Sequence, residues 1–342
     1  MLIQTKSYKL DLKHTFNISY SSRKTTDDVL IKISDNKIDG YGEASLPPYY
    51  QETPNSVINF LSKIQLKEID NIQQLKKVLE EIDLIEDNNT AAKASVDIAL
   101  HDYLGKKLGK PVYELYQINK STLPYTSFTI GIDQPDVLRK KISDAEEFHI
   151  LKIKLGTNND KGLIEIIRQE TDKSLYVDVN QGWSDKYYAL DMIYYLVSQN
   201  VLLVEQPMKV EMIEESSWLK ERSPLPIIAD EAVKRLVDIE KISNSYHGLN
   251  IKLMKCTGIH EAYKMIIKAK EMKLKVMLGC MTETSCAISA AMLLSPLADY
   301  ADLDGNLLIA NDPFHFTGIV DGKIVLSNKP GLGIQPKYEL FK

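Results

Sequence analysis

Residues 151–156 read Leu-Lys-Ile-Lys-Leu-Gly and carry the pattern that organises most of this chain. Successive side chains of an extended strand point to opposite faces, so Lys152 and Lys154 share one face and the apolar residues share the other. Further short apolar runs recur about 22 to 27 residues apart, with helical patterns between them. These runs lie at residues 126–130, 175–179, 201–204, 226–229, 249–253, 276–278 and 300–303.

The alternation of strands and helices predicts an α/β fold with parallel strands. Eight such units close naturally into a barrel of the triosephosphate isomerase (TIM) type. An open doubly wound sheet is the competing architecture, but no strand is followed by the glycine-rich phosphate-binding motif that such sheets carry. We therefore predict a barrel domain over residues 116–309, with its functional site at the carboxyl ends of the strands.

The first part of the chain has a different sequence pattern. Strand-like stretches come first, followed by helical patterns, which predicts an α+β domain over residues 1–115. The tail, about residues 310–342, is expected to rejoin this domain. The predicted strands are 2–12, 29–33 and 38–44, and the predicted helices are about 55–65, 71–82 and 90–107.

The composition excludes several classes of protein. The 342 residues are 44% hydrophobic and carry a net charge of −5, so no broad basic field is available for nucleic acid or a membrane surface. The three cysteines lack C-x-x-C spacing, which favours a reducing compartment. The N-terminus lacks an apolar signal segment, and no apolar run is long enough to span a bilayer. We expect a cytoplasmic protein with a small-molecule partner; the composition leaves the oligomeric state open, a homo-oligomer included.

Carboxylates end three successive predicted strands. Asp178, Glu205 and Asp230 are 27 and 25 residues apart, about one strand-helix unit each, so their side chains should converge. Three hard oxygen ligands without histidine or cysteine suit Mg²⁺ rather than zinc. The alternative is that each acid caps the helix that follows it.

Lys252 lies on the sixth predicted strand, four strands from Lys154 in a ring of eight, so the two lysines should face each other across the barrel mouth. A carbon acid held between them can lose a proton to one lysine and regain it from the other, which inverts its configuration. Like charge and an adjacent Mg²⁺ would lower the lysine pKa values towards working pH. The alternative is a buried lysine paired with one of the acids.

Together with K-I-K, the motifs D-V-N-Q-G-W, V-E-Q-P, A-D-E and N-I-K-L-M-K make the whole chain resemble the enolase superfamily, in particular its muconate lactonising subgroup. The resemblance implies a modified (β/α)7β barrel with an α+β capping domain. It implies that Asp178, Glu205 and Asp230 bind Mg²⁺ and that Lys154 and Lys252 are the acid/base pair. It also implies that Lys152 supports the substrate carboxylate.

The last predicted strand ends Ala-Asp-Leu-Asp-Gly at residues 301–305. This D-x-D resembles that of the dipeptide epimerases, in which the two acids hold the substrate's α-ammonium group, and this implies that role for Asp302 and Asp304. A solvated acidic turn is the alternative. The segment Gly-Cys-Met-Thr-Glu-Thr-Ser at 279–285 resembles the same group, so we expect its side chains to line the substrate site, except that Thr284 or Ser285 is equally well explained as a helix N-cap. The expected lining residues are Cys280, Met281 and Thr282.

Substrate choice should depend on loops of the capping domain that close over the barrel mouth. The predicted loop at 19–24 carries Tyr20 and Arg23, and Arg23 is placed like the arginine that reads the glutamate side chain in Ala-Glu epimerases. The loop at 47–53 is longer and more aromatic than expected. The predicted activity is epimerisation of a dipeptide at its C-terminal residue, with L-Ala-D/L-Glu as the leading substrate. The alternative is an N-succinylamino acid racemase or o-succinylbenzoate synthase, which needs no D-x-D.

Overall fold

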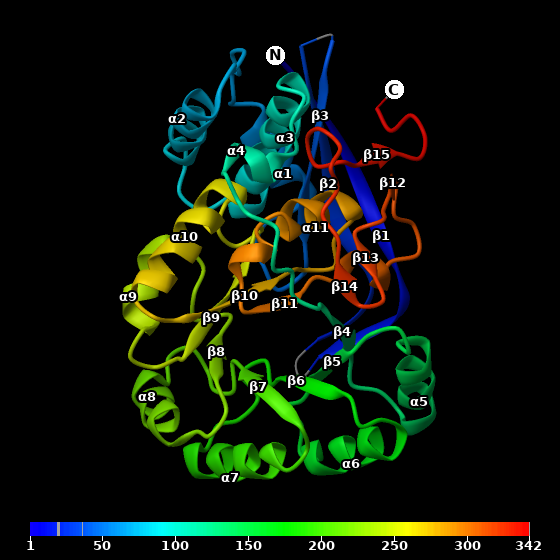
Figure 1. The fold of residues 1–342 in the computed structure, drawn as a ribbon, viewed down its shortest axis with the longest axis vertical. Coiled ribbons are helices and arrows are strands. Elements are labelled where there is room, and N and C mark those ends of the chain that lie inside the picture. Colours follow the sequence, from blue (N-terminus) through cyan, green and yellow to red (C-terminus); the bar gives the residue numbers. More distant parts are fainter. Residues whose placement is uncertain (19–20, 36, 342) are drawn as a thin grey trace.

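The computed structural model describes residues 1–18, 21–35 and 37–341. Figure 1 shows an N-terminal part, blue to cyan, above a barrel that runs from green to orange. The red C-terminal segment returns to the N-terminal part, so both chain ends lie at the same end of the molecule. None of the helices in these described ranges is both long and apolar enough to cross a membrane.

The N-terminal sheet is an antiparallel meander with the order β1-β2-β3. Its strands are longer than predicted, because β1 and β2 remain paired well beyond the apolar stretches, as far as Ile18 and Ser21. The pairing extends from Leu2 with Ser34 to Phe16 with Arg23 and beyond. The predicted loop around Arg23 is therefore corrected to a strand position. The bounds are β1 Leu2–Ile18, β2 Ser21–Ser34 and β3 Asp39–Leu46.

Helix α3 covers this sheet at very close range. An added Cβ at Gly42 would lie 2.0 Å from the carbonyl oxygen of Ser95, and one at Gly40 would lie 2.1 Å from that of Ala99. Glycine is therefore required on β3 where the backbone of α3 approaches it. The helices of this part are α1 Pro54–Leu61, α2 Ile72–Asp83, α3 Thr90–Lys107 and α4 Val112–Leu115.

Eight parallel strands form the second sheet, as predicted, in the unbroken order β4 to β11. A β-bridge between Thr126 and Ala301 brings the last strand beside the first, so the sheet is a nearly closed barrel rather than an open doubly wound sheet. The strands are β4 Ser127–Ile130, β5 Ile150–Lys154, β6 Ser174–Asp178, β7 Val201–Glu205, β8 Ile227–Ala229, β9 Gly248–Lys252, β10 Lys275–Gly279 and β11 Tyr300–Asp302.

A helix follows each of the first seven barrel strands, and in the described chain the short 3₁₀ turn η3, Gly305–Leu308, follows β11 instead. This is the (β/α)7β arrangement. The helices are α5 Pro135–Asp144, α6 Asp160–Glu170, α7 Lys186–Val197, α8 Ile213–Arg222, α9 Ile239–Ile242 with the 3₁₀ turn η1 Leu236–Asp238, α10 Ile259–Glu271 and α11 Ser285–Met292.

Carboxylates of the N-terminal part cap two barrel helices. Asp97 accepts hydrogen bonds from the backbone nitrogens of Ile259 (2.7 Å) and His260 (3.1 Å) at the start of α10. Glu43 accepts one from the backbone nitrogen of Thr284 (2.7 Å) at the start of α11. Negative charge is stabilised at a helix N-terminus, so these contacts fix the two parts of the molecule to each other.

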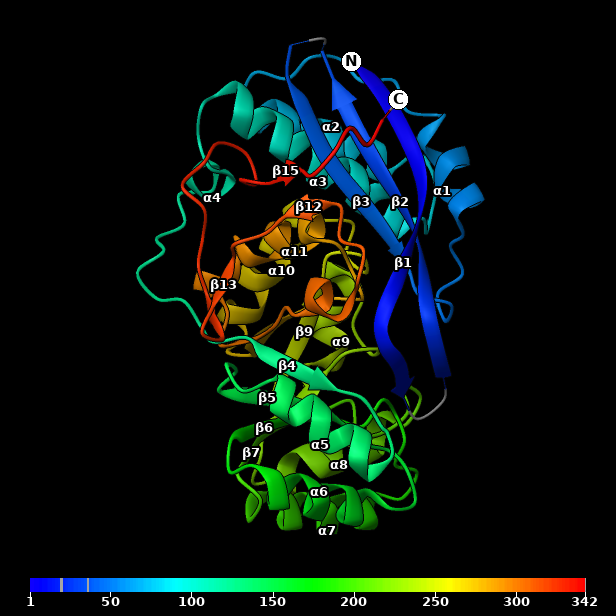
Figure 2. The same cartoon turned by 90° about the vertical axis from the view of Figure 1, so that its right-hand side faces the viewer.

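The C-terminal tail packs on the N-terminal part. The backbone nitrogen of Leu332 donates to Asp102 Oδ1 at 2.9 Å, and Gly331 forms a β-bridge with Pro111. Figure 2 shows this red segment lying across α3 and beside the sheet. The remaining short elements are η2 Ser295–Leu297, β12 Phe314–His315, β13 Ile319–Val320, β14 Lys323–Ile324 and β15 Gln335–Pro336.

Candidate active site

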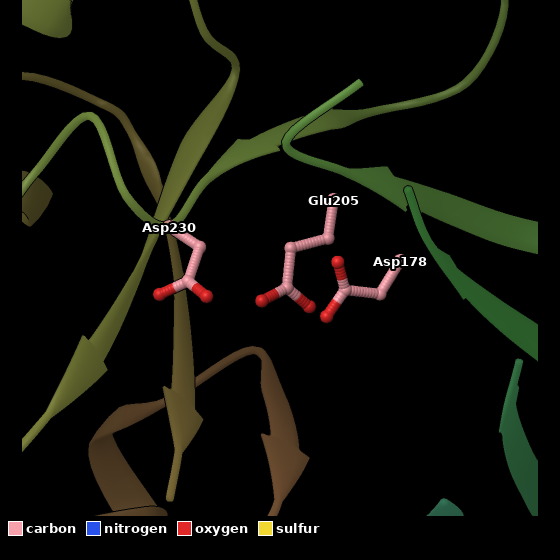
Figure 3. A group of neighbouring side chains, drawn as sticks. All are labelled: Asp178, Glu205 and Asp230. Atoms are coloured by element: carbon pink, nitrogen blue, oxygen red, sulfur yellow. The ribbon is translucent and has the colours of Figure 1, made fainter. Parts of the chain in front are cut away.

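Three acids converge at the carboxyl ends of neighbouring strands. Asp178 and Glu205 end β6 and β7, and Asp230 directly follows β8. Each offers an oxygen within 4.8 Å of the others, and all three are buried. In Figure 3 the carboxylate of Glu205 lies between the other two. An apolar cluster lies beneath the acids, since strand side chains alternate. Tyr176, Leu203 and Ile228 lie two positions before the acids on the same strands, and Met277 of β10 completes the cluster.

The backbone after two of these acids has an uncommon conformation. Asn180 and Gln206 adopt positive φ angles of 46° and 36°, which non-glycine residues rarely do, so the chain turns sharply just beyond the acids. The side-chain oxygen of Gln206 accepts hydrogen bonds from the backbone nitrogens of Asp230 (2.9 Å) and Ala232 (3.2 Å). Gln206 therefore ties the end of β7 to the end of β8.

Asn250 supports the central acid. Its side-chain amide donates a hydrogen bond to Glu205 Oε1 at 2.7 Å. The other oxygen, Oε2, accepts no hydrogen bond among the described residues, although it lies 2.7 Å from the ammonium of Lys152. Three buried carboxylates, one with an incompletely satisfied oxygen, form a donor set that fits a hard divalent cation such as Mg²⁺.

Both lysines of β5 point into the barrel, as their alternation predicted. Lys152 is 1% exposed and lies close to three carboxylates: Asp178 at 3.1 Å, Glu205 at 2.7 Å and Asp302 at 2.7 Å. Lys154 is closer to the open pocket and lies 2.6 Å from Asp178. Both lysines line the pocket, but Lys152 is held more deeply within the acidic network than Lys154, which is 7% exposed.

Lys252 enters from β9 and contacts Asp230 Oδ2 at 2.8 Å. A second lysine, Lys255, contacts the other oxygen of Asp230 at 2.5 Å and the backbone carbonyls of Asp230 and Asn250 at 2.7 and 3.1 Å. Lys255 had no predicted role. No periodicity signals it, because it lies in the turn after β9 rather than on a strand face.

The pKa values of these acids follow from burial and from the lysines. Burial raises the pKa of Asp178, but Lys154 and Lys152 outweigh it and hold that pKa below its ordinary value. Burial also raises the pKa of Asp230, but Lys252 and Lys255 outweigh it and hold that pKa below its ordinary value. Burial and the charge of Asp178 instead raise the pKa of Glu205 to about 7.

The pKa of Lys252 reflects the balance of the protein's own charges around it. Burial lowers its pKa and so does the like charge of Lys152, but Asp230 and Glu205 outweigh both and hold the pKa well above its ordinary value. Within the protein's own charges, the neighbouring carboxylates therefore dominate over crowding by other lysines.

The two acids of D-x-D are held from the first barrel strand. Asp302 Oδ1 accepts a hydrogen bond from the hydroxyl of Ser127 at 2.7 Å. Asp304 accepts one from the backbone nitrogen of Thr129 at 2.6 Å and one from its hydroxyl at 3.3 Å. Burial and the charge of Asp302 raise the pKa of Asp304 to about 7, so a cation bound here would relieve a repulsion.

One pocket brings the predicted residues of both domains together. Asp178 and Glu205 are fully buried and do not contribute to its walls, and Tyr20 lies outside the described residues. The predicted residues in the walls are Arg23, Lys152, Lys154, Asp230, Lys252, Cys280, Met281, Thr282, Asp302 and Asp304. The sequence analysis gave no site role to five others, which are Phe16, Thr129, Asn180, Glu231 and Leu308; Tyr49 and Tyr50 of the second loop complete the lining.

Arg23 is a buried cation with an unused donor. It is 8% exposed, and its guanidinium lies 4.9 Å from the ring centre of Phe16 and 5.5 Å from that of Tyr49. Its Nε donates to Thr26 at 3.1 Å, while Nη1 has no acceptor among the described residues. A buried donor without a partner is costly, so this position favours an anionic ligand group.

The segment after β10 combines lining and structural residues. The thiol of Cys280 lies 3.3 Å from the carbonyl of Asp302, and burial together with Glu283 raises its pKa well above the ordinary value. A thiol that stays protonated is a poor nucleophile. The hydroxyl of Thr284 accepts a hydrogen bond from the backbone nitrogen of Cys286, so the N-cap interpretation of Thr284 is confirmed.

Both parts of the chain match known protein families. Residues 3–116 match the mandelate racemase / muconate lactonizing enzyme N-terminal domain, and residues 137–340 match the enolase C-terminal domain-like family. An L-Ala-D/L-Glu epimerase of Bacteroides thetaiotaomicron is 51% identical over 328 residues, covering 96% of this chain and 86% of that relative.

Two solved structures extend the likeness to three dimensions. A dipeptide epimerase from Enterococcus faecalis V583, complexed with Mg and the dipeptide L-Leu-L-Tyr, has a TM-score of 0.88 at 30% identity and covers 97% of this chain and 98% of its own. An N-succinyl Arg/Lys racemase from Bacillus cereus has a TM-score of 0.90 at 28% identity, with coverage of 98% and 95%. Fold alone therefore does not separate these two activities.

Proposed function

Because the chain belongs to the mandelate racemase and muconate lactonizing enzyme family of the enolase superfamily, we propose that it is a dipeptide epimerase. The observation that carries the proposal is one pocket that contains both an opposed lysine pair and an aspartate pair. Lys154 and Lys252 come from β5 and β9, four strands apart in the ring, and Asp302 and Asp304 come from the end of β11.

The lysines perform the proton transfer. One lysine, as a neutral amine, removes the α-proton of the C-terminal residue and becomes an ammonium group. The other, as an ammonium group, donates a proton to the opposite face and becomes neutral. The carbon is inverted with no other bond changed, and the opposite epimer uses Lys154 and Lys252 in exchanged roles.

A divalent cation completes the site. Asp178, Glu205 and Asp230 would hold Mg²⁺, which supplies a Lewis acid that stabilises the negative charge developing on the substrate carboxylate. Lys152 adds a fixed positive charge beside these acids. Its burial keeps this charge in a region of low dielectric, where it is worth more than in water.

The aspartate pair and Arg23 select the substrate. Asp302 and Asp304 would bind the free α-ammonium group of the dipeptide through charge-assisted hydrogen bonds. Arg23 would bind an acidic second side chain, because its Nη1 lacks a partner within the described chain and it lines the same pocket. L-Ala-D/L-Glu meets both requirements, and it is the substrate named for the 51% identical relative.

The second candidate is an N-succinylamino acid racemase, because the chain is also similar in structure to the Bacillus cereus racemase. The same lysines and metal ligands would serve it. The aspartate pair opposes it, because a succinyl carboxylate placed beside Asp302 and Asp304 would meet like charge.

The deciding experiment is proton NMR in D₂O with Mg²⁺. Unblocked dipeptides and N-succinylamino acids are incubated separately with the enzyme. Loss of the α-proton signal of L-Ala-L-Glu, with appearance of the second epimer, supports the proposal. Exchange of N-succinylamino acids alone would replace it with the racemase reading.

A further inference from the structure

A second cavity of about 310 Å³ lies against the reaction pocket, whose own volume is about 50 Å³. The two share three lining residues, Phe16, Thr129 and Leu308, which form a common wall. One ordered water needs about 10–15 Å³ on the same measure, so the second cavity is the larger of the two and has room for a sizeable side chain.

An irregular segment of β1 builds the roof of this cavity. The register of pairing with β2 shifts between Asp11 and Phe16, so residues 12–15 form an irregular, bulged part of the strand. The segment contacts the barrel at both ends: Leu12 forms a β-bridge with Ile309, and Asn17 exchanges hydrogen bonds with Ile132. Figure 2 shows this end of β1 descending beside β4 and α5.

The interior of the cavity is mainly apolar. Phe128 and Phe148 pack with their ring centres 4.9 Å apart, and Leu12 and Leu307 add aliphatic surface. Of the charged lining residues, Lys13, Asp144 and Glu147 are exposed at the rim, and the buried Lys141 is paired with Asp133 at 3.0 Å. Such a lining fits an apolar side chain better than a charged one.

The common wall lies beside the aspartate pair. Thr129 donates hydrogen bonds to Asp304 through its backbone nitrogen and its hydroxyl, and its hydroxyl also lies 3.5 Å from Asp302. An α-ammonium group bound to these acids carries its own side chain only two bonds from the nitrogen. The side chain of the N-terminal residue must therefore lie near this wall.

We propose that Leu308 restricts the N-terminal residue of the substrate to a small side chain by closing off the second cavity, which is a latent subsite for a large apolar side chain. The inference rests on the proposed function and adds the residue that limits the first position. Phe16 and Thr129 also form the wall, but Phe16 packs against Arg23 and Thr129 holds the aspartates, so each has another task. Leu308 offers only an apolar side chain, and it lines both cavities.

The test compares L-Ala-L-Glu with L-Leu-L-Glu and L-Phe-L-Glu in the holoenzyme, with kcat and KM determined separately. Leu308→Ala should raise the kcat/KM ratio of L-Phe-L-Glu to L-Ala-L-Glu by about 10- to 200-fold, the range by which hydrophobic pockets discriminate side-chain size. Most of the change should appear as a lower KM for the bulky substrates. Leu308→Val, a milder change, should move the ratio in the same direction.

Leu307→Ala is the matched control, since Leu307 lines the second cavity alone. An unchanged ratio in both Leu308 variants, or an equal change in Leu307→Ala, overturns the inference. A wild-type enzyme that already prefers L-Phe-L-Glu overturns it as well. If the wild type turns over no dipeptide at all, the proposed function has failed, which is distinguishable from failure at Leu308 alone.

Discussion

The ammonium nitrogen of Lys152 lies 2.7 Å from Oδ2 of Asp302, although the two residues are 150 positions apart in the chain. The same nitrogen lies 2.7 Å from Glu205 and 3.1 Å from Asp178. Lys152 therefore joins the three-acid cluster and the aspartate pair into one charged network. A change at either cluster alters the electrostatic environment of the other, so metal binding and substrate binding should be coupled.

Activity should require a divalent cation held by the three acids. Asp178→Asn, Glu205→Gln and Asp230→Asn each remove an anionic ligand, and each should lower kcat/KM by about 10³-fold or more, since a metal contributes several kcal/mol to such a step. Isothermal titration with Mg²⁺ should show the matching loss of affinity. Asp136→Asn changes an exposed carboxylate on α5 and should have no effect. Full activity in excess chelator would contradict the prediction.

The two lysines should act on opposite epimers. Lys154→Ala and Lys252→Ala should each abolish epimerisation, yet each should still exchange the α-proton of one epimer with D₂O through the lysine that remains. Proton NMR of the separate L,L and L,D dipeptides measures this. Lys275→Ala is the control and should retain both reactions. Lys275 begins β10, at the end of the strand away from the site, and forms an exposed ion pair with Asp299. Exchange of the same epimer by both variants would rule out the two-base mechanism.

A free α-ammonium group should be necessary for efficient turnover. N-acetyl-L-Ala-L-Glu should lose most of kcat/KM, because acetylation removes one or two charge-assisted hydrogen bonds of roughly 1.5 to 3 kcal/mol each and leaves Asp302 and Asp304 without a cation. In Asp304→Asn the penalty for acetylation should shrink. Steady-state rates on the two substrates measure both effects. Equal turnover of the free and acetylated dipeptides would contradict the role of Asp302 and Asp304 in binding the α-ammonium group.

Arg23 should matter most when the second residue is acidic. Arg23→Ala should lower kcat/KM for L-Ala-L-Glu by about 10- to 100-fold, as expected for a lost charged hydrogen bond, and lower that for L-Ala-L-Gln much less. Arg139→Ala, an exposed arginine on α5, serves as the control. Equal losses on both substrates would remove Arg23 from the specificity argument and direct attention to Tyr49 and Tyr50, which line the same pocket.

Stability should fall as pH rises from about 5 to 8. Glu283 is buried beside Glu43, and burial raises its pKa from 4.5 to about 8. The folded state therefore binds a proton that the unfolded state releases between these values, so this contribution is present at low pH and lost as pH passes the folded pKa. Urea unfolding at several pH values measures this contribution. The free energy of unfolding of Glu283→Gln should change less with pH than that of the wild type, by roughly 1–3 kcal/mol over this range.

The exposed Glu81→Gln is the matched control for this measurement and should keep the wild-type slope. A slope in Glu283→Gln identical to that of the wild type would show that Glu283 does not carry the proton.

The barrel and the relative placement of its acids follow from the amino-acid pattern alone. Parallel strands end at one edge of a sheet, so acids one strand-helix unit apart had to meet, and Asp178, Glu205 and Asp230 do. Alternation along β5 likewise placed Lys152 and Lys154 on one face. These are local rules with fixed periods, and they can be read without knowing which segments touch.

Features that depend on contacts between distant segments could be found only in the folded molecule. Arg23 lies on a strand rather than a loop, because β1 and β2 stay paired as far as Ile18 and Ser21. The raised pKa of Lys252 and the contacts of Lys255 with Asp230 depend on how turns and strands pack around one charge cluster. The wall formed by Phe16, Thr129 and Leu308 joins three segments that no periodicity links, so its position and the cavity behind it follow from packing alone.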